Sequence, residues 1–192
     1  CGASSAVTSG LAWGTPTHAD DDVSKNGVHS FEIHISDDEL EDLRRRLSMT
    51  RWPPRSPDKP WALGSDRAYL EELIAYWRDK YDWRKHEAEL NKFAHFTTTI
   101  DGQRIHFVHH KGKGESSLPL LMTHGWPGTF WEMLPSVRRL ADPAAHGGNA
   151  ADSFDVVVPS IPGFGFSDEP QKGTDMSRTA ELWIGLMDRL GY

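Results

Sequence analysis

The stretch His124-Gly125-Trp126-Pro127-Gly128 holds the residues best suited to chemistry. It follows residues 120–122, a short apolar run typical of a buried central strand. Pro127 has no N–H for a strand ladder, and the two glycines allow backbone angles that other residues avoid. An apolar helical pattern begins at Phe130, so an abrupt turn must join the strand to a helix. Such a turn can leave backbone N–H groups pointing into a cleft, where they would stabilise a developing oxyanion.

His124 stands where the strand meets the turn, and its imidazole allows two interpretations. It can act as a general base, or its ring can hold the turn in place through a hydrogen bond. The position directly after an apolar run favours the second role, with Gly125 and Pro127 shaping the turn beside it.

Three nearby histidines are the strongest hint of a metal site. On a strand, His106 and His110 share one face, whereas His109 points to the other. Cys1 is the single cysteine, which excludes a cysteine-based site, and no clustered carboxylate joins the histidines. We therefore expect no bound metal.

A pair of glycines after an apolar strand pattern, Gly163 and Gly165, is reminiscent of a dinucleotide-binding loop. Asp168 occupies the position of the motif's third glycine, and no helix is predicted to begin there. The loop therefore lacks the features that bind the phosphates of a dinucleotide. We expect a Gly/Pro loop that lines the cleft, a solvated Asp168 and no cofactor.

The elements that must position the turn begin near Phe31. Residues 31–35 alternate like a strand, and Ser36 with Glu39 has the pattern of a capping box for a first helix. A proline-rich loop follows, then a second helix from about Asp66 and a third over residues 83–93. The tryptophans of this region allow a ligand platform or anchors to the rest of the chain, and anchors are favoured: Trp52, Trp61, Trp77 and Trp83.

From residue 95 the apolar pattern changes to alternation. Two strand patterns, residues 95–100 and 103–110, flank Asp101-Gly102, which is a strong signal for a tight hairpin. The helix after the turn should be kinked or started at Pro135.

The last third of the chain predicts one more strand and one more helix. A buried strand is expected over residues 154–158, and a final helix should be capped by Ser177 and end at Gly191. An α/β fold is predicted by the order of these elements, which is hairpin, strand, helix, strand and helix.

Composition narrows the function classes. The chain has 192 residues and a formal net charge of −7, which argues against nucleic acid because its binders carry a basic face. No apolar run approaches the roughly 18 residues that a membrane helix needs.

Residues 1–19 contain no Asp, Glu, Lys or Arg. Thr17-His18-Ala19 resembles the cleavage site of an export signal, whereas Cys1 could instead be the lipidated first residue of a lipoprotein, giving membrane association through its lipid alone. A third interpretation is an arbitrary start in a disordered leader. We expect export, with a cytoplasmic location as the alternative, and we expect residues 1–28 to be disordered or removed. Because residue 1 is not Met, further sequence is expected upstream.

Several motifs together resemble one enzyme family. They are Arg51-Trp52-Pro53, Tyr76-Trp77, Tyr81-Asp82-Trp83-Arg84, Leu90-Asn91, Ile100-Asp101-Gly102, Ile105-His106-Phe107-Val108-His109, His124-Gly125-Trp126-Pro127-Gly128 and Pro159-Ser160-Ile161-Pro162-Gly163-Phe164-Gly165-Phe166-Ser167. Over about residues 30–192 the chain resembles the epoxide hydrolases of the α/β-hydrolase fold, in the microsomal and juvenile-hormone branch that has an N-terminal arm. The turn motif alone is shared with dehalogenases, so the arm and the Pro159–Ser167 loop make the resemblance specific.

This resemblance implies a reaction and roles. An Asp nucleophile would open a small apolar epoxide to form an ester, and a His–carboxylate pair would activate water to hydrolyse it. Tyrosines of a cap would polarise the epoxide oxygen. The backbone N–H of Trp126 would help to hold the oxyanion of the hydrolytic step, and the Trp126–Pro127 bond would be cis.

The chain departs from the family in one respect, since it contains neither Gly-x-Ser-x-Gly nor Gly-x-Asp-x-Gly. The nucleophile, acid, base and cap are therefore expected downstream, and the 192 residues alone are expected to be inactive. We predict a leader at 1–30, an arm at 31–94 and the front half of an α/β-hydrolase core at 95–192. The alternatives are a non-catalytic binding piece, a dehalogenase or an esterase, and the oligomeric state stays open.

Overall fold

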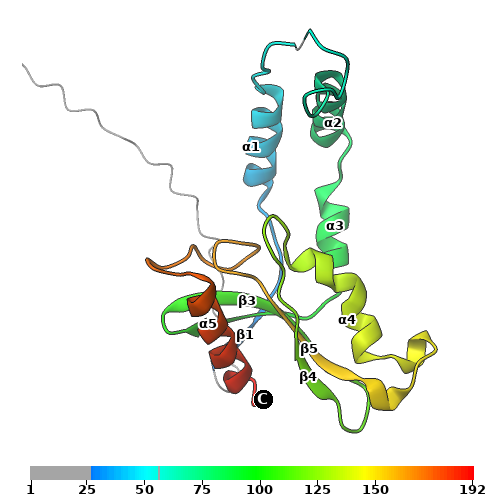
Figure 1. Cartoon of the computed structure of the whole chain (residues 1–192), viewed down its shortest axis with the longest axis vertical. Coiled ribbons are helices and arrows are strands. Elements are labelled where there is room, and N and C mark those ends of the chain that lie inside the picture. Colours follow the sequence, from blue (N-terminus) through cyan, green and yellow to red (C-terminus); the bar gives the residue numbers. More distant parts are fainter. Residues whose placement is uncertain (1–26, 56) are drawn as a thin grey trace, which may run out of the picture.

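The computed structural model describes residues 27–55 and 57–192. Within these residues a five-stranded sheet forms the centre, in the order β1-β2-β3-β5-β4 (Figure 1). Only the β4–β5 pair is parallel, and the other neighbours are antiparallel. The strands are β1 Val28–Phe31, β2 His95–Ile100, β3 Gln103–His110, β4 Leu118–Leu121 and β5 Phe154–Pro159.

The β2–β3 hairpin has the predicted bounds and turn. Asp101 and Gly102 have φ angles of 47° and 80°, as expected for a two-residue hairpin turn that matches the twist of its strands. Ile100 therefore lies opposite Gln103, and the register continues to His95 opposite Val108.

Two helices cover opposite faces of the sheet. The short η1 Phe130–Met133 leads into α4 Leu134–Ala141, which packs with Val156 and Val158 on one face. The last helix, α5 Met176–Arg189, packs with Val157 on the other face. Successive side chains of a strand point to opposite faces, so β5 contributes to both layers. The α/β fold predicted from the sequence is confirmed.

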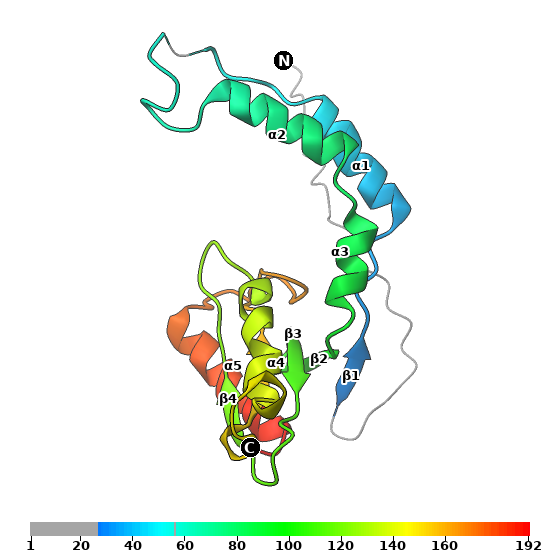
Figure 2. The ribbon, with the colours of Figure 1, turned by 90° about the vertical axis from the view of Figure 1, so that its right-hand side faces the viewer.

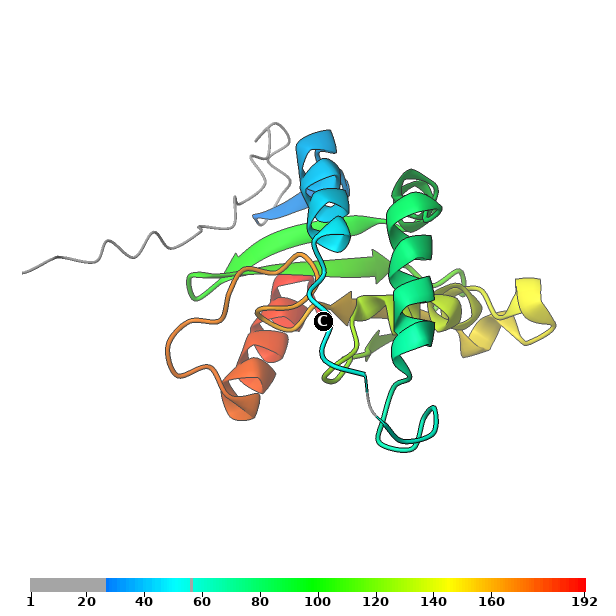
Figure 3. The same cartoon turned by 90° about the horizontal axis from the view of Figure 1, so that it is seen from above.

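The arm consists of helices that rise from the sheet (Figures 1 and 2). They are α1 Asp37–Ser48, α2 Arg67–Asp79 and α3 Trp83–Leu90, and Figure 3 shows α1 and α2 in front of the sheet. Each begins at a polar side chain that accepts a backbone N–H of its first turn: Ser36 with its predicted capping box, Asp66 and Asp82.

The strand expected over residues 31–35 is shifted towards the N-terminus. Phe31 and Ile33 alternate into the core as predicted, but only residues 28–31 pair with a strand, β2. Beyond Phe31 the backbone is held by side chains instead. Asn91 accepts from Ile33 N–H at 2.9 Å and donates to Ile33 O at 2.8 Å, while Glu87 accepts from Ile35 N–H at 2.7 Å. The alternating pattern of residues 31–35 therefore predicted correctly which side chains are buried. It predicted wrongly that the backbone beyond Phe31 would pair with another strand.

Replacing Asn91 with alanine should destabilise the protein by about 1–3 kcal/mol, because two partly buried backbone groups of Ile33 would lose their partner. The change in the midpoint of urea unfolding measures this loss. Asn91→Asp is the matched control, since it keeps an acceptor for Ile33 N–H and removes the donor, and it should fall between alanine and wild type near neutral pH. Equal midpoints for wild type and alanine would contradict a role for Asn91 in fastening the arm.

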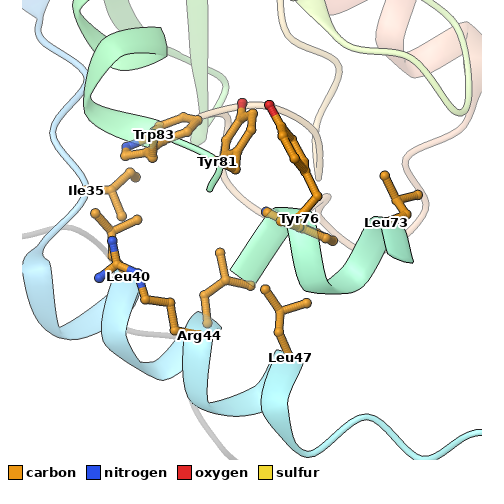
Figure 4. A pocket seen from close by; sticks show the side chains of 10 residues that line it. Ile35, Leu40, Arg44, Leu47, Leu73, Tyr76, Tyr81 and Trp83 are labelled. Atoms are coloured by element: carbon orange, nitrogen blue, oxygen red, sulfur yellow. The ribbon is translucent and has the colours of Figure 1, made fainter. Parts of the chain in front are cut away.

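The arm encloses a hollow of about 570 Å³ between α1 on one side and α2 and α3 on the other (Figure 4). Its lining is mainly apolar and includes Leu40, Leu73 and Tyr76. Of the four tryptophans interpreted as anchors, Trp83 packs against the core, whereas Trp77 and Trp61 are exposed by 43% and 58%. The anchor interpretation is therefore right for Trp83 and wrong for these two.

Three local predictions need correction. The strand expected to be central and buried is β4, which lies at the edge of the described sheet with Leu118 exposed. The last helix is capped by Asp175, whose carboxylate accepts from Arg178 N–H at 2.8 Å, rather than by Ser177. The third helix ends at Leu90, earlier than residue 93. Short turns of helix, η2 Ala144–His146 and η3 Ala150–Asp152, lie in the loop before β5.

The predictions of an export signal and of a lipidated Cys1 fall on residues 1–26, which lie outside the described residues. The predicted disorder or removal of residues 1–28 falls there too, except at its end, which is wrong because Val28 pairs with Thr98 in β1. Among the helices that the structure describes, none is long and apolar enough to span a bilayer.

Candidate active site

Two loops leave the sheet side by side at the carboxyl ends of the parallel strands β4 and β5. Leu121 pairs with Val157, and Met122 N–H continues the ladder to Val157 O at 2.9 Å. Residues 123–129 and 160–167 therefore emerge from the same edge of the sheet. In open α/β sheets, ligands bind at this edge.

The turn from Gly125 to Gly128 closes through one backbone hydrogen bond, from Gly128 N–H to Gly125 O at 2.7 Å. The Trp126–Pro127 bond is cis, as the resemblance implies. A four-residue turn of this kind makes no use of the N–H of its second residue. Among the described residues nothing accepts a hydrogen bond from Trp126 N–H, and the Trp126 side chain is 83% exposed. This N–H is therefore available to an oxygen that reaches the turn.

The ring of His124 joins this turn to the neighbouring loop. It is 3% exposed and accepts a hydrogen bond at Nε2 from Ile161 N–H over 3.1 Å. Burial lowers the pKa of His124, so the ring is neutral near pH 7 and carries its proton on Nδ1. A nitrogen that already accepts a backbone N–H is poorly placed to take a proton from water. The geometry favours turn support over the general-base interpretation.

The Nδ1 of His124 is buried and has no hydrogen-bond partner in the part of the chain that the structure describes. The backbone of Gly125 and Gly128 lies near enough to oppose part of the pKa shift caused by burial, as does the carboxylate of Glu132. That carboxylate lies over Gly128, where an added Cβ would clash with both of its oxygens. Glu132 therefore places a negative charge beside the turn, on a side chain that can swing away.

The loop after β5 is fixed by its own hydroxyl groups. Ser167 Oγ donates to Ser160 O at 2.8 Å and accepts from His106 N–H at 3.0 Å. Gly165 has a φ of 56°, and a Cβ at this position would lie 2.5 Å from Ser160 Oγ, so only glycine fits without rearrangement. The pair of glycines that resembled a dinucleotide loop thus serves close packing against Ser160.

The sequence interpretation missed a buried chain of polar side chains below this loop. His95 Nδ1 lies 3.0 Å from His106 Nε2, and His106 Nδ1 lies 2.9 Å from Ser160 Oγ. His106 is fully buried, and both of its ring nitrogens are engaged in these contacts. The hairpin register contains the signal: with Thr97 opposite His106, the ring of His95 lies on the same face two residues away.

Two carboxylates that could be considered as nucleophiles, Asp155 and Asp168, are engaged by other side chains. Asp168 is an exposed loop carboxylate, as expected, and it pairs with Arg104 at 3.1 Å. Asp155, near the start of β5, binds Lys111 Nζ at 2.8 Å and the hydroxyl of Tyr192 at 2.6 Å, and these partners lower its pKa to about 2 despite its burial. Among the described residues, no three potential metal ligands gather.

Comparison with known proteins identifies the family to which this arrangement belongs. The domain family described as epoxide hydrolase N terminus matches residues 28–133, which is more than half of the chain. The chain belongs to the epoxide hydrolase family. The match includes the arm, the hairpin and the whole Gly125–Gly128 turn.

Full-length epoxide hydrolases resemble the chain over most of its length. A relative from Stigmatella aurantiaca is 51% identical over 167 residues, which are 86% of this chain and 38% of the relative. Epoxide hydrolase 1 of Sus scrofa is 39% identical over 188 residues, 94% of this chain and 40% of that protein. Juvenile hormone epoxide hydrolase 2 of Ctenocephalides felis is 36% identical over 184 residues, 94% and 38% respectively. The chain thus spans about two fifths of these epoxide hydrolases.

Solved structures agree with this assignment. The Aspergillus niger epoxide hydrolase has a TM-score of 0.76 and 31% identity, with 85% of this chain and 43% of that chain covered. The juvenile hormone epoxide hydrolase of Bombyx mori has a TM-score of 0.71 and 29% identity, with 86% and 44% covered. The family and the α/β fold are therefore established, while the catalytic roles of His124, Gly125, Trp126 and Pro127 and the division at residues 30 and 94 stay predictions.

Proposed function

We propose that this chain supplies the arm and the oxyanion-binding turn of an enzyme that hydrolyses small apolar epoxides to vicinal diols. The observation that carries the proposal is the N–H of Trp126, which has no acceptor among the described residues, at the carboxyl ends of β4 and β5. The ring of His124 fixes the turn to Ile161, so the donor is held before any substrate arrives. A donor that is already in position needs no reorganisation free energy when charge develops in the transition state, and such donors accelerate reactions for this reason.

The reaction has two steps. A carboxylate oxygen of an Asp attacks an epoxide carbon, the C–O bond of the ring breaks, and the alkoxide takes a proton from a tyrosine. Water, activated by a histidine, then attacks the carbonyl carbon of the new ester, and the carbonyl oxygen becomes an oxyanion. Trp126 N–H donates to that oxyanion until the acyl–oxygen bond breaks and releases the diol. The turn therefore acts in the second step, and the nucleophile, base and tyrosines belong to sequence beyond the motifs of this chain.

The arm separates this proposal from its alternatives. Dehalogenases and esterases share the turn motif, but the match to an epoxide hydrolase N terminus begins at residue 28 and includes the whole arm. A purely binding function has no support of this kind, because no feature of the arm's hollow identifies a ligand.

The proposal is tested on the full-length gene product. It should convert styrene oxide to the diol and leave a matched haloalkane and a matched carboxylic ester unchanged. Haloalkane or ester hydrolysis without diol formation would replace the proposal with one of the other hydrolases. Specific binding without turnover of any of the three would favour the non-catalytic alternative.

The 192-residue chain by itself should form no diol. It has no nucleophile motif, and Asp155 and Asp168 are held by Lys111 and Arg104, so no ester forms and a prepared oxyanion site has nothing to stabilise. Product analysis with styrene oxide, next to the full-length protein, checks this. Turnover by the 192-residue protein that disappears in Asp155→Asn or Asp168→Asn would identify that carboxylate as a nucleophile and contradict the prediction.

A further inference from the structure

A buried chain of polar groups connects the arm to the loop that supports the oxyanion turn. It begins at the backbone carbonyl of Leu90, the last residue of α3, which lies 2.9 Å from His95 Nε2. It continues through His106 and ends at the hydroxyl of Ser160. His106 and Ser160 are fully buried and His95 is 2% exposed, so no member of the chain relies on bulk water.

The positions of the protons follow from one fixed end. A carbonyl oxygen can only accept, so His95 carries its proton on Nε2 and donates to Leu90 O. The Nδ1 of His95 must then accept, so His106 carries its proton on Nε2 and donates to His95. The Nδ1 of His106 accepts in turn, so the hydroxyl of Ser160 donates to it. Every donor and acceptor is satisfied in this single arrangement, with both imidazoles neutral.

The surroundings keep the two rings neutral. Phe31, Phe130 and Phe166 each place a ring within 5.3 Å of the centroid of the His106 ring. Burial lowers the pKa of both histidines, and for His106 the neighbouring His95 and Arg104 lower it further. A neutral, fully satisfied network of this kind fixes one geometry, because any rotation of a ring would leave a buried polar atom without a partner.

Ser160 is the point at which this chain reaches the candidate site. Its neighbour Ile161 donates the N–H that holds the ring of His124, and His124 directly precedes the turn that presents Trp126 N–H. Phe130, which packs on both histidines, belongs to η1 just after the same turn. The turn is thus held from Ile161 on one side and from the histidine pair on the other.

We propose that His95, His106 and Ser160 are positioning residues for the oxyanion turn, acting as one oriented hydrogen-bond chain that couples the arm to Trp126 N–H. The inference deepens the proposed function and rests on it for the catalytic effect. The positional effect stands on the contacts alone. The arm then serves catalysis without touching substrate, since the end of α3 sets the first link.

The first measurement is the protonation state of the histidines in the full-length protein, labelled with ¹⁵N at its histidines. Two-bond nitrogen–proton correlation spectra should show both His95 and His106 as neutral Nε2–H tautomers at pH 7. A proton on Nδ1 of His106, or a charged ring, would overturn the chain whatever the variants do.

The second measurement follows backbone amide exchange in Ser160→Ala, which removes the donor to His106, and in His95→Leu, which removes the other end of the chain. Both should raise the exchange rate of Ile161 N–H by about tenfold or more, because its hold on His124 is loosened. Ile105→Val is the control: it lies beside His106 on the opposite face of β3 and should leave this rate unchanged. An unchanged rate in both test variants, or the same rise in the control, would overturn the positional effect.

Single-turnover kinetics test the catalytic consequence. In both test variants hydrolysis of the ester intermediate should slow by about tenfold or more, while its formation keeps the wild-type rate, and Ile105→Val should change neither step. Equal slowing of both steps would overturn the assignment to the oxyanion turn. If the wild-type protein opens no epoxide, the proposed function is wrong. The histidine tautomers and the exchange rate of Ile161 N–H still test whether the hydrogen-bond chain holds the loop at Ile161 in place. Should both variants fail to fold, the wild-type tautomers decide it.

Discussion

A backbone ester in place of the Gly125–Trp126 amide should slow hydrolysis of the ester intermediate by about 10²–10³-fold, the usual cost of losing one oxyanion donor. Incorporating indole-3-lactic acid at position 126 of the full-length protein replaces Trp126 N–H with an oxygen and keeps the indole. Formation of the intermediate should be nearly unchanged, because no oxyanion on the acyl group develops in that step. Rapid-quench single-turnover measurements separate the two rates.

The same exchange has a second effect that needs its own control. An ester carbonyl is a weaker acceptor, and Gly125 O receives the hydrogen bond from Gly128 N–H that closes the turn. Glycolic acid at position 128 removes that hydrogen bond completely while leaving Trp126 N–H in place. The control should therefore cost much less than the ester at 126. Equal decreases in the hydrolysis rate in the two proteins would show that only the conformation of the turn matters. An unchanged hydrolysis rate in the protein with the ester at position 126 would show that Trp126 N–H does not bind the oxyanion.

Acidification from pH 6.5 to pH 4 should destabilise the fold by about 3 kcal/mol through His109 alone. Burial lowers the pKa of this ring to about 4, with Lys111 and His110 lowering it further and Asp155 opposing them. In the unfolded chain the ring returns to a pKa near 6.5, so between these two values the unfolded state binds a proton that the folded state does not. The contribution of His109 to the free energy of unfolding is therefore fully present above pH 6.5. It decreases as the pH falls from 6.5 to 4, and below pH 4 this group causes little further change.

The surroundings of His109 explain why it resists protonation. Its Nε2 lies 3.0 Å from the hydroxyl of Tyr192, which donates to Asp155 and receives a hydrogen bond from Lys111. The ammonium group of Lys111 therefore stands next to any charge placed on the ring. His95 and His106, whose pKa values are also lowered by burial, shift the stability in the same direction on acidification.

Urea unfolding of the wild type and of His109→Gln across pH 4–7 measures this contribution. The variant should lose less stability on acidification, so the difference between the two proteins should change by about 3 kcal/mol over the range. His146→Gln replaces an exposed histidine and should follow the wild-type curve. Parallel curves for wild type and His109→Gln would contradict a lowered pKa at this site.

Local chemistry allowed the sequence alone to determine much of this fold. Asp101-Gly102 fixed the hairpin and its register, because two residues with positive φ match the twist of the flanking strands. Ser36 and Glu39 fixed the start of α1 through contacts that span three residues. The motif from His124 to Gly128 marked the turn, since a strand cannot continue through Pro127. In each case the deciding interactions lie within a few residues of one another.

Choices between equivalent local signals needed the tertiary structure. Asp175 and Ser177 are both good caps, and only the folded chain shows which carboxylate or hydroxyl receives the N–H of Arg178. Phe31 and Ile33 both point inwards, yet the backbone beyond Phe31 binds the side chains of Asn91 and Glu87, which are more than 50 residues away. The apolar run in β4 could not show whether it lay at the centre or the edge of the described sheet, because that depends on which strands come to lie beside it.

The supports of the candidate site were decided almost entirely by tertiary structure. Trp126 could be singled out because its motif is contiguous, whereas His95, His106 and Ser160 come from three separate elements and have no common spacing. A histidine in a strand has the same sequence signature whether it binds metal, packs in the core or relays a hydrogen bond. Folding selects among these by placing one fixed acceptor, Leu90 O, at the end of the chain, and that placement exists only when α3 and the hairpin are packed together.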